Sequence, residues 1–425
     1  MLNKTGLLAK TGVFGKKIFF TVFFAMVLLS FSFTISMQAN PPLFDAYSKL
    51  KNSVPYVSLG DLETTPIIYV ESLSQRGGAQ FYVKDDGICG IDKMGKKIFA
   101  GNKRRKHEFL LADALAHGAK RIYTLGGAGS NHATATAAYA RELGLACTLV
   151  LGPQRNTRYV QRNLKLDLFY GANIVACQTR QERTQTCKEL VQRDPAGYFI
   201  PLGGSNKIGA IGYVNAAFEL KKQIEQGLMP KPDVIYVTVS SAGMAAGLIV
   251  GIKAAGLDIL VKPVRIDDTP EEIETELSHL IKEVSEYLYE HDSSFPRISI
   301  APSQLNVIND IAGEEYVADD HARIARNCIF DAYALTTPAG ASAIQELFQV
   351  TGIKLDGTYS GKAFAACLRD LKSGELQGKT VLFWDSFCDG DFSEYTSAVD
   401  TKKLPLELQK YIDEVYPIQL LDQGV

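Results

Sequence analysis

The sequence predicts an α/β fold with two open, twisted and mostly parallel sheets that carry helices on both faces. Short apolar strand patterns alternate with helical patterns along most of the chain, and several of the strands end in small-residue turns that lead into helices. The composition, 46% hydrophobic and 22% charged residues, is that of an ordinary globular protein. At 425 residues the chain is long enough for more than one domain.

The predicted elements follow one another as strand, turn and helix. Hydrophobic periodicity predicts helices over 108–117 and 134–143, and strands over 121–125, 146–151 and 171–176. Further along, an apolar strand over 233–239 runs into a small-residue turn and a helix from about residue 245. The last buried strand is predicted over 380–384. The charged segment 267–290 has the pattern of an amphipathic surface helix.

The first 39 residues predict a signal peptide or a membrane anchor. Four lysines precede an apolar run over 18–37, and the first acidic residue is Asp45. A cleavage site near Ala39 would have Met37 where a small residue is typical, so cleavage stays open. No arginine precedes Arg76, which argues against a mitochondrial transit peptide. We therefore expect export to the periplasm or medium, or anchoring by this segment, rather than a cytoplasmic protein.

Charge and cysteine content exclude some classes of partner. A net charge of −2 gives no reason to expect a nucleic-acid partner. The seven cysteines show no CxxC pair and no metal-ligand spacing, so we expect buried thiols and no metal site. Free thiols fit poorly with export to an oxidising compartment, and the sequence leaves that conflict open.

Four segments contain most of the candidate functional residues: FAGNKRRKHEFLL (99–111), GGAGSNH (126–132), PLGGSNKIGAIGY (201–213) and LDGTYSGKA (355–363). Any one of these segments alone is weak evidence: KRRK can be a basic surface run, and GGAGSN can be a strand-to-helix turn with a Ser or Asn cap. Their order and spacing over 64–391 resemble the D-cysteine desulfhydrase and 1-aminocyclopropane-1-carboxylate deaminase family of pyridoxal-5′-phosphate (PLP) enzymes.

The resemblance implies the tryptophan-synthase-β type of fold (fold type II), in which a small domain is inserted into a larger one and PLP lies in the cleft between them. By this likeness, residues 106–216 form the small domain, and 40–105 with 217–425 form the large PLP-binding domain. Because relatives in this family associate, a homodimer or a higher homo-oligomer is also expected.

The resemblance also assigns roles to single residues. Lys103 is the Schiff-base lysine. Independently of the resemblance, a second cation among Arg104, Arg105 and Lys106 is a candidate for lowering its pKa, unless helical geometry points these side chains away. By the resemblance, Asn131 is the partner of the ring hydroxyl oxygen of PLP, and Ser130 lies beside the substrate α-carbon as a candidate for proton transfer. Ser130, Asn131 and His132 contact the substrate. Tyr359 and Tyr333 are the active-site tyrosines.

The predicted phosphate loop departs from the family pattern Gly-Ser-Gly-Gly-Thr. Here the residues are Ser240, Ser241, Ala242, Gly243 and Met244, between a strand and a helix. Backbone N–H groups and the helix dipole favour an anion at such a turn. Met244 removes a hydroxyl donor and Ala242 restricts the backbone, whereas Ser240 restores one donor. An ordinary tight turn is the alternative.

Two positions favour the desulfhydrase branch. The residue after Tyr359 is Ser360, where deaminases of the family have an acidic residue that faces the pyridine nitrogen. A hydroxyl favours a neutral pyridine and a weaker electron sink, which suits loss of a thiolate better than opening of a cyclopropane. His132, where deaminases tend to have Gln, agrees. Trp384, the single tryptophan, stands close to where the family has His-Thr-Gly-Gly, and its bulk is a candidate for reshaping the pocket.

These observations predict a PLP-dependent carbon–sulfur lyase or deaminase acting on a small amino acid. D-Cysteine desulfhydrase-like β-elimination to pyruvate, ammonia and sulfide is the first candidate, with Lys103 or Ser130 taking the α-proton. Deamination of 1-aminocyclopropane-1-carboxylate is the alternative within the family. A non-catalytic protein that binds PLP or an amino acid is the alternative of another class, suggested by the altered phosphate loop.

Overall fold

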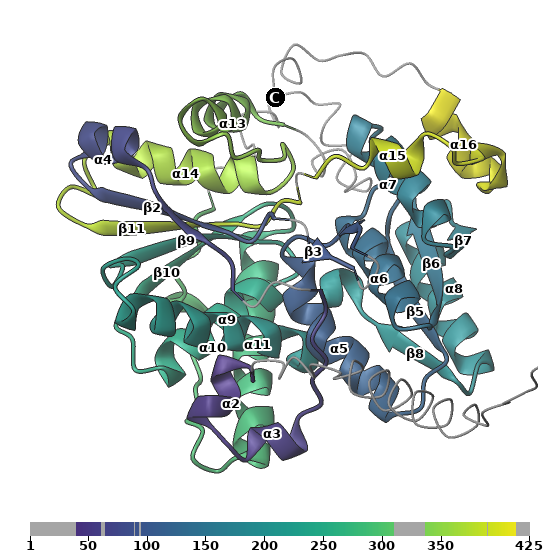
Figure 1. Ribbon diagram of the computed structural model, residues 1–425, viewed down its shortest axis with the longest axis horizontal. Helices are drawn as coiled ribbons and strands as arrows, with labels where there is room; N and C mark the ends of the chain where they lie inside the picture. The colour runs from purple at the N-terminus through teal and green to yellow at the C-terminus, as the bar shows by residue number, and fades with distance from the viewer. Residues whose placement is uncertain are drawn as a thin grey trace, which may run out of the picture. The chain divides into compact units, whose positions relative to one another are not determined.

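Two sheets with parallel strands organise the computed structural model (Figure 1). The structure describes residues 40–60, 64–88, 90–92, 95–309, 336–388 and 390–413. The predicted leader over 1–39 and Tyr333 lie outside the described residues. Within these ranges, no helix is long and apolar enough to cross a membrane.

The larger sheet has five strands in the order β1 (Ile67–Tyr69), β2 (Gln80–Asp85), β11 (Thr380–Asp385), β9 (Val234–Val239) and β10 (Leu260–Arg265). Only β1 runs antiparallel to its neighbour; the other pairs are parallel. Every residue of β9 and β11 is buried, as expected for strands covered by helices on both faces. Figure 1 shows α9, α10 and α11 below this sheet and α13 and α14 above it.

The smaller sheet has four parallel strands in the order β7 (Asn173–Ala176), β6 (Ala146–Gly152), β5 (Arg121–Gly127) and β8 (Gly197–Ile200). Helix α8 packs against β5, β6 and β8, whereas α6 packs against β5 and β6 together with α7 (Figure 1). A short antiparallel pair, β3 (Gly90–Ile91) and β4 (Lys97–Ile98), lies outside both sheets.

The longer helices are α5 (Lys103–Ala116), α6 (Asn131–Glu142), α7 (Arg158–Phe169), α8 (Arg180–Arg193), α9 (Lys207–Glu225), α10 (Gly243–Ala254), α11 (Pro270–His291), α13 (Pro338–Thr351) and α14 (Ser360–Lys372). The shorter helices and 3-10 turns are α2 (Pro42–Ala46), α3 (Leu50–Ser53), α4 (Glu71–Gly77), α15 (Ser393–Thr396), α16 (Leu406–Asp413), η1 (Leu202–Gly204), η2 (Pro302–Gln304) and η5 (Thr401–Lys403). Side-chain caps fix several starts, for example the capping box of Thr269 and Glu272 at α11.

The predicted α/β fold is confirmed, and each strand and helix predicted above overlaps an observed one. The strands of the smaller sheet all come from 121–200, and those of the larger sheet come from 67–85, 234–265 and 380–385. The described residues from Pro41 onward nevertheless form one compact unit, so the domain boundaries after residues 105 and 216 stay a prediction.

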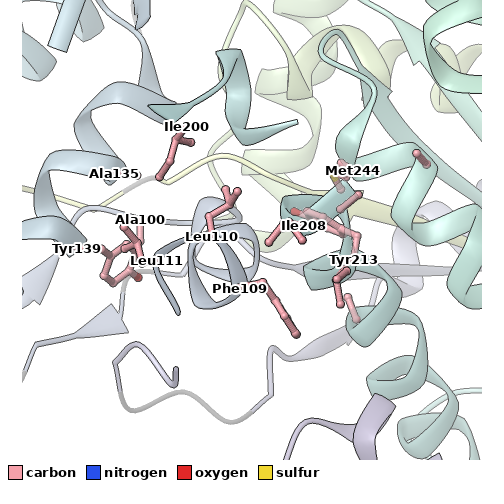
Figure 2. Packing of buried hydrophobic residues seen from close by; sticks show 14 of the residues in the cluster. Ala100, Phe109, Leu110, Leu111, Ala135, Tyr139, Ile200, Ile208, Tyr213 and Met244 are labelled. Carbon is pink, nitrogen blue, oxygen red and sulfur yellow. The ribbon is translucent and has the colours of Figure 1, made fainter. Parts of the chain in front are cut away.

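Helix α5 lies in the main core and is buried along nearly its whole length. Figure 2 shows Phe109, Leu110 and Leu111 pointing in different directions into this core. At Gly212 of α9, an added Cβ would lie 2.0 Å from the carbonyl oxygen of Arg105, so only glycine lets the two helices approach so closely. This packing holds the first turn of α5 in a fixed place.

The described cysteines are buried thiols, as the sequence predicts: Cys147, Cys177, Cys187, Cys367 and Cys388. Burial raises the pKa of the Cys147 thiol, which keeps it protonated and unreactive at neutral pH. These side chains act as small hydrophobic residues in the core.

Candidate functional site

Lys103 is the first residue of α5, directly after Asn102. The three basic residues that follow it, Arg104, Arg105 and Lys106, are all buried, so this segment is not a surface run. Burial lowers the pKa of the Lys103 amine to about 8, while the carboxylate of Asp356 opposes that shift. A much larger fraction of this amine is therefore neutral near pH 8 than for an ordinary lysine, as a nucleophile or a base requires.

Burial, rather than a neighbouring cation, is the main cause of that lowered pKa. The guanidinium of Arg105 is held by Asp86 and Glu219, at 2.7 Å from each. Lys106 donates from Nζ to Gly203 O and Ser205 Oγ, both at 2.9 Å. Helical geometry points these two side chains to different places, and desolvation is the larger influence on Lys103.

A cavity of about 300 Å³ brings most of the predicted site residues together. This volume is at the lower end of the range for small-molecule sites. The predicted residues that line it come from the starts of α5, α6, α10 and α14 and from the turns before them: Lys103, Ser130, Asn131, His132, Ser240, Ser241, Ala242, Met244 and Tyr359. Segments more than 250 positions apart thus meet at one site.

The start of α6 supplies the predicted substrate contacts. Ser130 is the N-cap, and its Oγ accepts the N–H of Ala133 at 3.2 Å. His132 lies 3.1 Å from Thr124 Oγ1 through Nε2 and stacks on His107, with ring centroids 5.3 Å apart. Burial, together with the nearby His107 and Lys103, holds the pKa of His132 well below its usual value, so this imidazole is neutral.

The turn before α10 has the features of an anion cradle. Ser205 Oγ donates to Ser241 Oγ at 2.8 Å and accepts hydrogen bonds from the backbone N–H of Gly243 at 3.2 Å and from Nζ of Lys106 at 2.9 Å. A Cβ at position 243 would lie 2.6 Å from Ser205 Oγ and 2.8 Å from Lys106 Nζ, so a side chain there would displace both of these groups. Hydroxyls, a lysine and the N-terminus of a 12-residue helix converge here, which favours a phosphate.

Ala242 adopts a backbone conformation that favours glycine, with φ 57° and ψ −31°. Replacing Ala242 by glycine is expected to raise the free energy of unfolding by about 1 kcal/mol, because relief of the strain exceeds the added chain entropy. Urea denaturation of the full chain measures this change. Ala245→Gly is the matched control: Ala245 is helical and buried on α10, so its replacement is expected to lower stability. If Ala242→Gly instead lowered the free energy of unfolding, the backbone at Ala242 would not be strained.

The turn before α14 contains a buried carboxylate that the sequence interpretation did not single out. Asp356 lines the cavity, and its carboxylate accepts the N–H of Tyr359. Burial raises the pKa of Asp356. Backbone hydrogen bonds from Tyr359 and Thr358, and the nearby Lys362 and Lys103, oppose that shift. The sequence could have indicated Asp356 as a site residue, because it lies inside the LDGTYSGKA segment.

Ser360 does not line the cavity. Its side chain is fully buried, and Oγ accepts the backbone N–H of Asp356 at 2.9 Å, which closes the turn that presents Tyr359. Gly243 contributes through its backbone N–H rather than as a lining residue. Ser386 and Cys388, after β11, also line the cavity, and the sequence interpretation did not include them.

Trp384 lies in the core, away from the cavity lining. Its Nε1 donates to Asp86 Oδ2 at 2.8 Å, and the ring lies 5.9 Å from the guanidinium carbon of Arg105. The expectation that its bulk reshapes the pocket is therefore not met, because the side chain points into a buried ion-pair cluster instead.

The residues present fit PLP. The cavity has a lysine amine with a lowered pKa at one place and an anion cradle that includes Lys106 and Ser241 at another. Its volume suits a small cofactor with a small second ligand. Lys103 would hold the cofactor's aldehyde carbon, the turn before α10 its phosphate, and Asn131 its ring oxygen.

The comparisons with known proteins agree with this fit. Residues 59–386 match the family model described as pyridoxal-phosphate dependent enzyme. A Thermotoga maritima protein provisionally named a 1-aminocyclopropane-1-carboxylate deaminase is 30% identical over 76% of this chain and 93% of its own length. A Yersinia enterocolitica protein named D-cysteine desulfhydrase is 31% identical over 74% of this chain and 87% of its own. The crystal structure of an ACC deaminase homologue, 27% identical, superposes with a TM-score of 0.66 over 88% of this chain and 100% of its own.

Proposed function

We propose that this chain, which belongs to the pyridoxal-phosphate-dependent enzyme family, is a lyase that eliminates hydrogen sulfide from D-cysteine. That it is a PLP-dependent enzyme of the lyase or deaminase kind follows from the family and from its relatives. The single observation that supports elimination most is the meeting of Lys103, Ser130 and Tyr359 at one small cavity. An amine and two hydroxyls there can move the protons that β-elimination requires.

The lysine is the better candidate for removing the α-proton. Bound PLP supplies the electron sink that makes this proton acidic. The amine of Lys103 titrates near pH 8, so it can accept a proton close to neutral pH. The oxygen of Ser130 already accepts the N–H of Ala133, and a serine hydroxyl is a weak base without a partner that takes its proton. We assign Ser130 to substrate positioning beside Asn131 and His132.

The leaving group departs from Cβ as thiolate. Tyr359 lines the cavity and lies at the start of α14, where its hydroxyl can donate a proton or a hydrogen bond to the departing sulfur. Loss of the α-proton and of thiolate leaves aminoacrylate, which takes up water to give pyruvate and ammonia. Backbone N–H groups at the start of α6 suit the substrate carboxylate.

D-Cysteine is favoured over 1-aminocyclopropane-1-carboxylate by the residue after Tyr359. That residue is Ser360, and its hydroxyl is engaged by the backbone of Asp356, so this position supplies no carboxylate to protonate a pyridine nitrogen. A neutral pyridine is the weaker electron sink and suffices for a good leaving group such as thiolate.

Turnover by the full-length protein with added PLP tests the substrate. We expect sulfide and pyruvate in equal amounts from D-cysteine, at a higher kcat/KM than from L-cysteine, and little 2-oxobutanoate from 1-aminocyclopropane-1-carboxylate. Preferential release of 2-oxobutanoate would replace the desulfhydrase assignment with the deaminase one. PLP binding without turnover of any of the three would favour a non-catalytic binding protein.

We also propose that residues 1–39 export the chain or anchor it to a membrane, and that the chain forms a homodimer or a higher homo-oligomer. The basic and apolar pattern of that segment supports the first proposal, and the family likeness supports the second. Cell fractionation tests the export or anchoring of the chain, and light scattering of the purified protein measures its oligomeric state. A protein found only in the cytosol, or a monomer, would contradict them.

A further inference from the structure

Asn163, a residue of α7, contacts the loop that leads into α6. Its side chain is fully buried. From Nδ2 it donates to the carbonyl oxygen of Gly129 at 2.8 Å and to Oδ1 of Asn131 at 2.9 Å. Its own Oδ1 accepts from Nε of Arg162 at 3.0 Å. One amide thus connects an arginine of α7 with a residue that lines the cavity.

The chemistry of these partners fixes which way the Asn163 amide points. A backbone carbonyl can only accept a hydrogen bond, and an arginine Nε–H can only donate one. A reversed amide would place its oxygen against Gly129 O and its NH₂ against Arg162 Nε. Asn163 therefore presents its NH₂ group to the loop, and the side-chain oxygen of Asn131 accepts a hydrogen bond from it. The NH₂ of Asn131 is then the group that this side chain offers to a ligand.

The surroundings of Asn163 hold this arrangement in place. The guanidinium of Arg162 lies 4.8 Å from the ring centroid of Phe99 and 5.1 Å from that of Tyr159. On the loop, Gly129 donates its N–H to Gln154 at 2.9 Å. A Cβ at Gly129 would lie 2.7 Å from a methyl group of Val160, so α7 fits closely against the loop. Both ends of the connection are therefore packed against neighbouring residues.

We propose that Asn163 is a positioning residue that makes Asn131 a hydrogen-bond donor toward the ring hydroxyl oxygen of PLP. The inference rests on PLP as the cofactor and on Asn131 as its ring-oxygen partner. A donor at that oxygen stabilises its anionic form, whereas an acceptor repels it. Asn163 acts without touching the cofactor, by deciding which end of the Asn131 amide faces the cavity.

Asn163→Asp tests the proposal because it keeps the size of the side chain and replaces the donor by an acceptor. The variant forces Asn131 to turn its NH₂ toward position 163 and its oxygen toward the cofactor. Dissociation constants are measured by absorbance titration of the apoprotein with PLP and with 3-deoxypyridoxal 5′-phosphate, which lacks the ring hydroxyl. We expect PLP to bind about tenfold more weakly and the analogue to change less than about threefold.

Four further variants make the test decisive. Asn131→Ala should lose the preference for the hydroxyl, and adding Asn163→Asp to it should have little further effect on that preference. Asn163→Leu removes both donor and acceptor at similar volume and should reduce the preference without reversing the amide. Asn215→Asp is the control: Asn215 is also buried, on α9, and accepts from Leu43 N at 3.0 Å, so the ratio of the two constants should not change.

The outcomes separate a positioning role from a structural one. If Asn163→Asp and Asn163→Leu weaken both ligands equally, Asn163 only supports the loop and the proposal is overturned. If Asn131→Ala keeps the full preference for the hydroxyl, Asn131 does not face that oxygen and the proposal also fails. Neither result depends on turnover of D-cysteine, so a wrong substrate assignment would leave this test unaffected.

Discussion

Replacing Lys103 by alanine is expected to lower turnover of the true substrate by about 10³-fold or more. The reason is that this amine serves both as the covalent attachment of PLP and as the proposed base for the α-proton. The loss is measured as kcat with saturating PLP. The visible absorption band of bound cofactor should disappear or shift in the same variant, because its covalent link is missing.

The competing assignment for the covalent lysine is Lys106, three positions further along. Borohydride reduction of the PLP-loaded protein followed by peptide mass mapping distinguishes the two. We expect the pyridoxyl group on Lys103, because Lys106 Nζ is directed to Gly203 and Ser205 beside the anion cradle. A label on Lys106 would refute the assignment. Lys120→Ala, a change at an exposed lysine, is the control and should keep full activity.

The pH dependence of cofactor uptake follows from the lowered pKa of Lys103. Only the neutral amine attacks an aldehyde, so the rate of PLP uptake by the apoprotein should rise with pH and reach half its maximum near pH 8. The negative charge of Asp356 raises the pKa of Lys103, so Asp356→Asn should move that midpoint to lower pH. Stopped-flow absorbance measures both. A midpoint near that of an ordinary lysine would mean that the amine is solvated.

Replacing Arg105 by methionine is expected to destabilise the protein by about 3–5 kcal/mol. Arg105 donates to Asp86 and Glu219, each with two hydrogen bonds, and to Thr65 Oγ1 at 2.9 Å. Lys84 pairs with Glu219 in the same buried cluster. The variant removes one cation from a group of two cations and two carboxylates. An unpaired buried negative charge then remains, which is costly in a low dielectric.

Urea denaturation measures this loss, and a surface arginine supplies the control. Arg76 pairs with Glu346 but is 54% exposed, so Arg76→Met should cost no more than about 1 kcal/mol. Equal effects of the two substitutions would show that the buried cluster contributes no more than a surface pair. The cluster also joins β2, α5, α9 and β11, so Arg105→Met should lower affinity for PLP by loosening the start of α5.

The sequence interpretation did not foresee several strands for local reasons. Strand β10 contains Lys262 and Pro263, and a proline argues against a central strand. The structure places β10 at the edge of its sheet, where a missing N–H is tolerated. Strand β2 contains Lys84, whose charge suggests a surface position. The side chain is nevertheless fully buried, because its Nζ donates hydrogen bonds to Glu219 and Gln223. These partners lie 135 and 139 positions away in the sequence, so no local pattern indicates them.

The start of α5 shows the same limit. Its periodicity predicts a helix only from residue 108, whereas the helix begins at Lys103. The five residues before 108 are charged or polar in character and give no apolar stripe. Their burial depends on partners from other elements, such as Asp86 for Arg105 and Ser205 for Lys106. A pattern confined to one segment carries no information about such partners.

By itself, the sequence determined the α/β class, the position of strands β5, β6, β9 and β11, and the family to which the lysine and its motifs belong, because hydrophobic periodicity and short motifs are local properties. Only the tertiary structure decided the order of the strands, which places β2 beside β11 across about 300 residues. It also decided that Ser360 supports a turn, that Trp384 lies in the core and that Asn163 reaches Asn131. These depend on contacts between distant segments, whose free energies no single stretch of sequence contains.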